Sequence, residues 1–94
     1  MLSKKKRIID RDFLDSFHDL RCSACSKRGT EPAHIKTRGS GGDDVWENLL
    51  PLCRLHHSMQ HQIGWLKFAT KFESVLLDLK ARGWVFNEFG KMQK

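Results

Sequence analysis

The sequence lacks the features that mark secreted, membrane-spanning and repetitive proteins. No apolar run approaches the roughly 18 residues that cross a bilayer, and there is no internal repeat or low-complexity block. The basic run Lys4 to Arg7 is followed by only two apolar residues, too few for the apolar region of a secretory signal. There are three cysteines, whereas a disulfide framework needs an even number. We therefore expect a cytosolic protein whose cysteines are thiols or metal ligands.

The chain of 94 residues predicts one small domain over 1–94, with a core that a metal or a partner often has to supplement. Its formal net charge of +6 and pI of about 9.6 favour a polyanionic partner, nucleic acid first and an anionic membrane second. A basic domain that binds nothing charged is the alternative. Lys4 to Arg7 is interpreted either as a phosphate-contacting arm or as a solvated tail.

The periodicity of apolar residues predicts an α+β domain. Asp10 is suited to cap a helix, and Gly83 to end one. The predicted elements, in chain order, are a helix over 11–20, a strand over 33–36, a glycine-rich loop over 38–44, a strand over 49–52, a helix over 54–62, a break at Gly64, and a long amphipathic helix over 65–82. Residues 84–86 are expected to fold back onto the core, and residues 91–94 to be frayed.

Two pairs of metal-ligand residues share the same short spacing, Cys22-x-x-Cys25 and Cys53-x-x-His56. This spacing lets both side chains of a pair reach one ion, and Cys₃His is a standard closed set for tetrahedral zinc. A closed set leaves no open position, so this zinc would be structural and would stabilise the small core. The alternatives are a redox-active cysteine pair, an ordinary buried Cys53 and a helix-surface His56.

Four of the five histidines lie between positions 34 and 61. If His56 binds the zinc, His57 and His61 remain one helical turn apart and can chelate a second ion through two imidazoles. Two histidines leave positions open for water and phosphate, as a catalytic metal requires. His34 precedes them on a predicted strand and can accept a proton from water. A histidine pair with this spacing also arises by chance, so the order of the motifs carries more weight than the pair.

Residues 22 to 64 resemble an HNH endonuclease domain of the ββα-metal group, and in particular small bacterial and phage HNH proteins with a zinc-bound Cys pair on either side. Three stretches carry the resemblance besides the first cysteine pair: Pro32 to Asp44 (PAHIKTRGSGGDD), Glu47 to Cys53 (ENLLPLC) and Arg54 to His61 (RLHHSMQH). The resemblance implies a ββα-metal core between an N-terminal helix and a long C-terminal helix. It also implies a location in the bacterial or host cytoplasm.

The resemblance implies a role for each matching residue. His34 matches the general base that activates water, and Asn48 matches the asparagine that braces the loop and orients that histidine. His57 matches a ligand of the catalytic divalent ion, and His61 matches a further ligand found in some branches. The implied activity is cleavage or nicking of DNA with Mg²⁺, Mn²⁺, Ni²⁺ or Zn²⁺, leaving 5′-phosphate and 3′-hydroxyl ends.

One position departs from the family pattern. Many members place Asp or His directly before the general base as another metal ligand, and here that residue is Ala33. Three outcomes follow: the ion is held by His57 and His61 with water and phosphate, a carboxylate such as Asp43 or Asp44 joins them, or activity is weak or lost.

Three basic residues near the motif are candidates for contacting DNA phosphates, namely Arg38, Lys36 and Arg54, and for each the alternative is a solvated charge. The alternative functions are a non-catalytic zinc module that binds DNA, and a protein-interaction module in a phage or recombination assembly. The chain is expected to act as a monomer or a homodimer.

Overall fold

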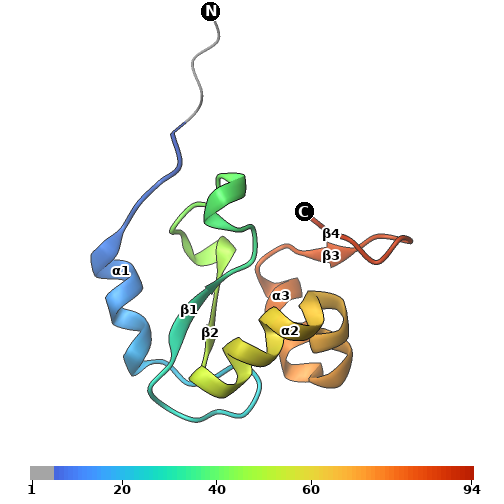
Figure 1. The fold of residues 1–94 in the computed structure, drawn as a ribbon, viewed down its shortest axis with the longest axis horizontal. Coiled ribbons are helices and arrows are strands. Elements are labelled where there is room, and N and C mark those ends of the chain that lie inside the picture. The colour runs from blue at the N-terminus through green and yellow to red at the C-terminus, as the bar shows by residue number, and fades with distance from the viewer. Residues whose placement is uncertain (1–5) are drawn as a thin grey trace, which may run out of the picture.

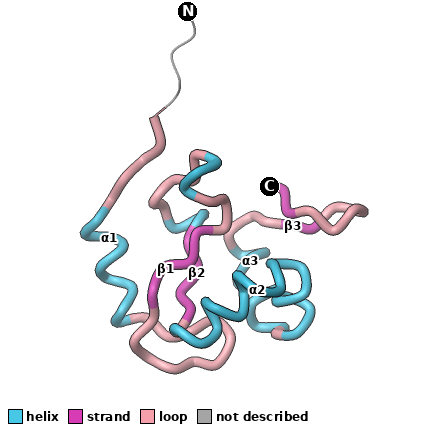
Figure 2. The backbone as a smooth tube through the Cα atoms, viewed as in Figure 1, coloured by secondary structure: helices cyan, strands magenta, loops and turns pink. Residues whose placement is uncertain are grey.

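A two-stranded antiparallel hairpin separates the N-terminal helix from the later helices of this α+β domain (Figure 1). The computed structural model describes residues 6–94. Its helices and strands are α1 (Arg11–Asp15), β1 (Glu31–His34), β2 (Leu49–Leu52), α2 (Arg54–Lys71), α3 (Glu73–Ala81), β3 (Val85–Phe86) and β4 (Met92–Gln93). Three 3₁₀ turns add Ser16–Asp19, Arg38–Ser40 and Trp46–Asn48. Figure 2 shows that loops and turns connect these elements.

The hairpin pairs Glu31 with Leu52 at one end and His34 with Leu49 at the other. All four residues of β2 are buried, as expected for a short apolar strand covered on both faces. The predicted strand over 49–52 is therefore confirmed, and the strand predicted over 33–36 lies two residues earlier, at 31–34. Both strands belong to the core, and β2 leads directly into α2.

The N-terminal helix begins as predicted but is shorter. The carboxylate of Asp10 caps it by accepting a hydrogen bond of 3.0 Å from the backbone N–H of Phe13. After Asp15 the chain continues as a 3₁₀ turn rather than an α-helix. The carbonyls of Phe17 and His18 accept bonds from the side chain of Thr30 and the backbone of Gly29, so they are unavailable to a longer helix.

The prediction of one helix over 65–82 is wrong. Gly64 breaks the helical backbone as expected, with φ 82° and ψ 165°, but a second interruption occurs at the extended residue Phe72 (φ −125°, ψ 102°). The Phe72 ring packs edge-on against the His56 ring, with centroids 5.0 Å apart. The helical spacing of apolar residues runs through this break because the helices on both sides of it face the same core.

The C-terminal end is ordered into a second hairpin. β3 pairs with β4, and Met92 packs against the core, so the expectation of a frayed end at 91–94 is wrong. Trp84 and Phe86 fold back onto the core as predicted, but Val85 between them is exposed, so that part of the prediction is wrong. The buried residues of that core are Cys22, Ala33, Ile35, Leu50, Leu52, Cys53, Phe68, Ala69, Val75 and Leu79. None of the helices formed by residues 6–94 has the length and apolar character of a transmembrane segment.

Candidate functional site

The predicted zinc ligands lie together at one end of the hairpin. The ligand atoms of Cys22, Cys25, Cys53 and His56 all lie within 4.8 Å of one another, and this is the one such group of three or more among residues 6–94. Nδ1 of His56 is 3.2 Å from Sγ of Cys53 and 3.8 Å from Sγ of Cys22. The sulfurs of Cys25 and Cys53 are 3.9 Å apart. The cluster could hold a metal ion such as zinc.

These separations fit a tetrahedral ion. Bonds of about 2.3 Å to sulfur and about 2.1 Å to nitrogen give tetrahedral edges of about 3.8 Å between sulfurs and about 3.6 Å between sulfur and nitrogen. The observed distances of 3.2–3.9 Å bracket these values. The donor set is also chemically consistent, because thiolate and imidazole are the ligands that zinc prefers. No disulfide competes, since all three cysteines are free.

A tight turn prepares the first cysteine pair for this role. Cys22 donates its N–H to the carbonyl of Lys27, and its own carbonyl accepts from Ser26, which adopts a left-handed φ of 66°. Burial raises the pKa of the Cys22 thiol, but backbone N–H groups of Cys53, Ala24 and Cys25 outweigh burial and lower that pKa. Backbone donors directed at sulfur favour the thiolate, the form that binds metal.

The remaining motif histidines meet in a separate hollow of about 390 Å³. His34 enters it from β1, His57 and His61 from α2, and Arg38 from the turn after β1. We call this site the histidine pocket. It brings together the residues predicted as base, metal ligands and one phosphate contact, although they come from three elements.

Glu31 fixes the state of His57. The carboxylate of Glu31 lies 2.6 Å from Nδ1 of His57, so in the neutral imidazole this nitrogen is the donor and Nε2 carries the lone pair. Nε2 of His61 lies 3.1 Å from Nε2 of His57. Two nitrogen ligands with metal bonds of about 2.1 Å are about 3.0 Å apart when they occupy neighbouring octahedral positions. The two Nε2 atoms are therefore close enough to chelate one ion, while Glu31 holds the ring of His57 through its other nitrogen.

Asp44 fixes the state of His34. Its side chain is fully buried and lies 2.7 Å from Nε2 of His34 and 3.0 Å from the guanidinium of Arg7. Burial raises the pKa of Asp44, but the bonds from His34, the backbone of Asp10 and Arg7 outweigh it and lower the pKa to about 2. An ionised Asp44 can only accept, so Nε2 of His34 donates, and in the neutral imidazole Nδ1 is then the nitrogen that can accept a proton.

Asn48 braces the loop between the two strands, and its side chain forms no hydrogen bond to His34. Its buried side chain accepts from the N–H of Lys36 at 2.7 Å and donates to the carbonyls of Lys36 and Asp43, both at 3.0 Å. The loop-bracing part of its implied role agrees with these bonds. The orienting bond to His34 comes from Asp44 instead.

The carboxylates considered as substitutes for a ligand at position 33 are held elsewhere. Ala33 is fully buried in the core. Asp44 is engaged by Arg7 and His34, and Asp43 accepts a bond of 2.6 Å from the N–H of Ile8. Within the described residues, only His57 and His61 therefore present converging ligand atoms in the histidine pocket.

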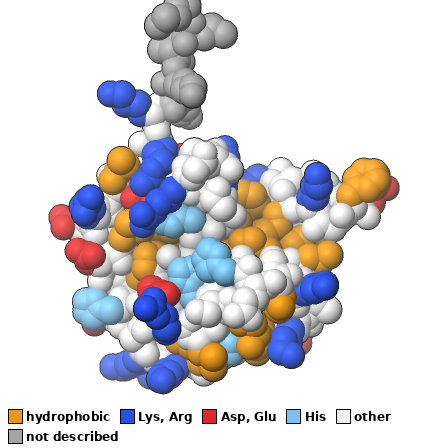
Figure 3. Space-filling model, in the orientation of Figure 1, with side chains coloured by type: hydrophobic (Ala, Val, Ile, Leu, Met, Phe, Trp, Pro, Cys, Tyr) orange, Lys and Arg blue, Asp and Glu red, His pale blue; other side chains and the backbone are white. Residues whose placement is uncertain are grey.

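The predicted phosphate contacts divide between different surfaces. Arg38 lines the histidine pocket, whereas Arg54 lies 3.5 Å from Glu31 and lines a different hollow with Cys53 and His56. Lys36 instead lines another hollow with Asp43 and Trp84. Figure 3 shows histidine side chains gathered in the middle of one face, with basic side chains around them. Lys4 and Lys5 of the predicted arm lie outside the described residues.

No protein-family model, curated protein or solved structure matches this chain.

Two residues of the site, Glu31 and Asp44, carry roles that sequence reasoning missed. Glu31 pairs with Leu52, and β2 leads from there into α2, so the strand register brings Glu31 beside His57. The only signal in the sequence is an acid two residues before the strand predicted to carry the base. Asp44 reaches His34 from ten residues further along the chain, through the path of the loop between β1 and β2, which no local pattern indicates.

Proposed function

We propose that this protein is a metal-dependent DNA endonuclease or nickase, with β1, β2 and the first part of α2 forming a ββα-metal core. The observation that carries the proposal is the histidine pocket, in which His34 and His57 are each held in one tautomer by a carboxylate. Oriented histidines can act as base and metal ligands in phosphodiester hydrolysis, and an exposed arginine beside them can bind the phosphate.

In this proposal, His34 is the general base. Nδ1 takes a proton from a water molecule, whose oxygen then attacks phosphorus as the bond to the 3′-oxygen breaks. The products carry a 5′-phosphate and a 3′-hydroxyl, the leaving oxygen gaining its proton from solvent. Ionised Asp44 stabilises the imidazolium that forms on His34, since its carboxylate lies 2.7 Å from Nε2.

His57 and His61 would hold a divalent cation through their Nε2 atoms. Such an ion supplies Lewis-acid stabilisation of the charge that develops on the phosphate and the leaving oxygen. Glu31 keeps the Nδ1 proton of His57 in place, so that Nε2 remains a ligand. Arg38 supplies a fixed positive charge at the edge of the same pocket.

The experiment is a cleavage assay on supercoiled plasmid, with Mg²⁺, Mn²⁺, Ni²⁺ or Zn²⁺ added to the zinc-loaded protein. We expect conversion to nicked or linear DNA in at least one metal. His34→Ala and His57→Ala should each reduce the rate by about 100-fold or more. His18→Ala is the matched control, because His18 is exposed and outside the pocket.

The same preparations discriminate between the functions. Binding of the plasmid without cutting in any metal would contradict catalysis and favour the non-catalytic DNA-binding module. Neither binding nor cutting would favour a protein-interaction role. Equal cutting by wild type, His34→Ala and His18→Ala would show that a contaminant is responsible.

A further inference from the structure

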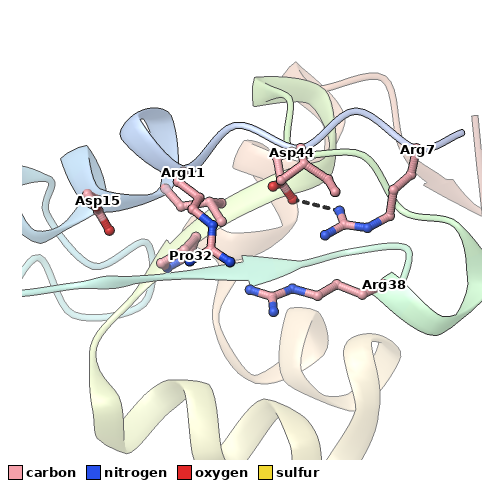
Figure 4. A pocket seen from close by; sticks show the side chains of 8 residues that line it. Arg7, Arg11, Asp15, Pro32, Arg38 and Asp44 are labelled. Atoms are coloured by element: carbon pink, nitrogen blue, oxygen red, sulfur yellow. Dashed lines mark hydrogen bonds and ion pairs between the residues drawn. The ribbon is translucent and has the colours of Figure 1, made fainter.

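A second hollow lies between α1 and β1 and is lined by three arginines (Figure 4). Arg7 comes from the N-terminal stretch, Arg11 from the start of α1, and Arg38 from the turn after β1. Their guanidinium groups are directed into the same space. Its volume is about 350 Å³, and Ile9, Leu14 and Pro32 form its apolar wall. We call this site the arginine hollow.

Two of the three charges are uncompensated. Arg7 is paired with Asp44 at 3.0 Å and donates to the carbonyl of Gly42. Arg11 and Arg38 are exposed and form no ion pair or side-chain hydrogen bond within residues 6–94. Asp15 lines the hollow but pairs with neither of them.

Guanidinium groups gathered around one space repel each other unless an anion lies between them. Phosphate is the anion whose oxygens best match the paired N–H donors of arginine. A backbone phosphodiester also suits the mixed lining, because its sugar can rest against the apolar wall while its oxygens face the arginines.

The arginine hollow and the histidine pocket share part of their lining. Arg38 and Pro32 line both sites, and the two sites lie on opposite sides of β1. A strand whose phosphate enters the histidine pocket can therefore continue past Arg38 into the arginine hollow. Arg11 lines only the arginine hollow, so its loss tests this site separately.

We propose that the arginine hollow is a second phosphate-binding subsite for DNA, which holds another backbone phosphate of the strand whose scissile phosphate lies in the histidine pocket. The inference rests on the proposed function for the identity of the ligand as DNA. It does not require that the DNA be cut, so the two claims can fail separately.

The test is fluorescence anisotropy of a labelled 20-base-pair duplex, with zinc-loaded protein and no added divalent metal, over a series of salt concentrations. Arg11→Gln should weaken binding about three- to tenfold, as expected for the loss of one charged hydrogen-bonded contact. It should also lower the slope of log K against log salt by about 1. Lys80→Gln removes the same charge from an exposed site on α3, outside both hollows, and should change affinity less than twofold.

Two further variants distinguish loss of the phosphate contact from damage to the fold. Arg11→Lys should recover part of the affinity, because charge returns without the planar fork. Asp15→Asn should tighten binding two- to threefold, because it removes the negative charge beside the phosphate. Inorganic phosphate at millimolar concentration should not displace the duplex, whereas a site for free phosphate would be emptied.

The inference is overturned if Arg11→Gln matches Lys80→Gln in both affinity and salt slope, or if Asp15→Asn weakens binding. Failure of the wild type to bind the duplex would also overturn it. Binding that depends on Arg11 in a protein that cuts no DNA would support the subsite and contradict only the nuclease proposal. DNA cleavage that does not change when Arg11 is replaced would support the nuclease proposal and contradict the subsite.

Discussion

Two carboxylates decide which nitrogen of each key histidine is free. Asp44 occupies Nε2 of His34, and Glu31 occupies Nδ1 of His57. The free atoms are Nδ1 of His34, which a base needs, and Nε2 of His57, which lies beside Nε2 of His61. Opposite tautomers on neighbouring histidines therefore match the different roles proposed for them.

Asp44→Asn should lower both stability and activity. The folded-state pKa of about 2 lies below the ordinary value of 3.8, so ionised Asp44 stabilises the fold above about pH 4 and loses that contribution as the pH falls toward 2. At pH 7 the substitution should cost about 2 kcal/mol of unfolding free energy in urea titrations. The exposed Asp19→Asn is the control, and equal stability of the two variants would contradict the prediction.

Glu31→Gln should weaken metal binding at the proposed His57–His61 site without unfolding the domain. We expect the affinity for Mn²⁺, measured by calorimetry on zinc-loaded protein, to fall about 10- to 100-fold, because the amide no longer holds the Nδ1 proton of His57 as a carboxylate does. The exposed ion pair with Arg54 contributes little to stability. Glu47→Gln, an exposed acid elsewhere, should leave Mn²⁺ affinity unchanged. A shared loss in both variants would contradict the prediction.

At the scale of elements, the loop between β1 and β2 positions the site. It is braced by Asn48, and Gly42 makes that packing possible. A Cβ at position 42 would lie 1.8 Å from the carbonyl oxygen of Lys36 and 2.8 Å from Nδ2 of Asn48. The glycine is thus required by close backbone approach.

Gly42→Ala should destabilise the protein by about 2 kcal/mol or more, because backbone atoms must move to admit the methyl group. Chemical denaturation measures this loss. Gly39→Ala is the matched control in the same loop, since position 39 has open space and no left-handed backbone. If the two variants are equally stable, the close packing around Asn48 is not what holds the loop.

The features that could be predicted from the sequence are those set by single residues or short spacings, and the others depend on packing in three dimensions. The cap at Asp10 and the break at Gly64 follow from single residues and were predicted. The interruption at Phe72 was not, because it depends on packing of that ring against His56 in three dimensions. The zinc ligands follow from short spacings, whereas Glu31 and Asp44 reach their histidines through strand register and loop path.

At the scale of the whole molecule, the Cys₃His cluster brings the tight turn at Cys22 and Cys25 together with the start of α2. Metal analysis of the purified protein should find about one tightly held zinc per chain. Chelation, or Cys22→Ser, should abolish cooperative thermal unfolding, because the ion would cross-link two segments of a small core. His61→Ala should keep the structural zinc and the fold. A folded, zinc-free Cys22→Ser protein would contradict the structural assignment.

The molecule carries a basic net charge and two hollows that share part of their lining, and both features suit the proposed cleavage of DNA by His34. The most direct test is the single-turnover cleavage rate under saturating protein, in the metal that supports the fastest reaction. We predict that His34→Ala loses about 100-fold or more in this rate, while it binds DNA and the metal as wild type does and His18→Ala cuts normally. A His34→Ala rate within twofold of the His18→Ala rate would contradict the account.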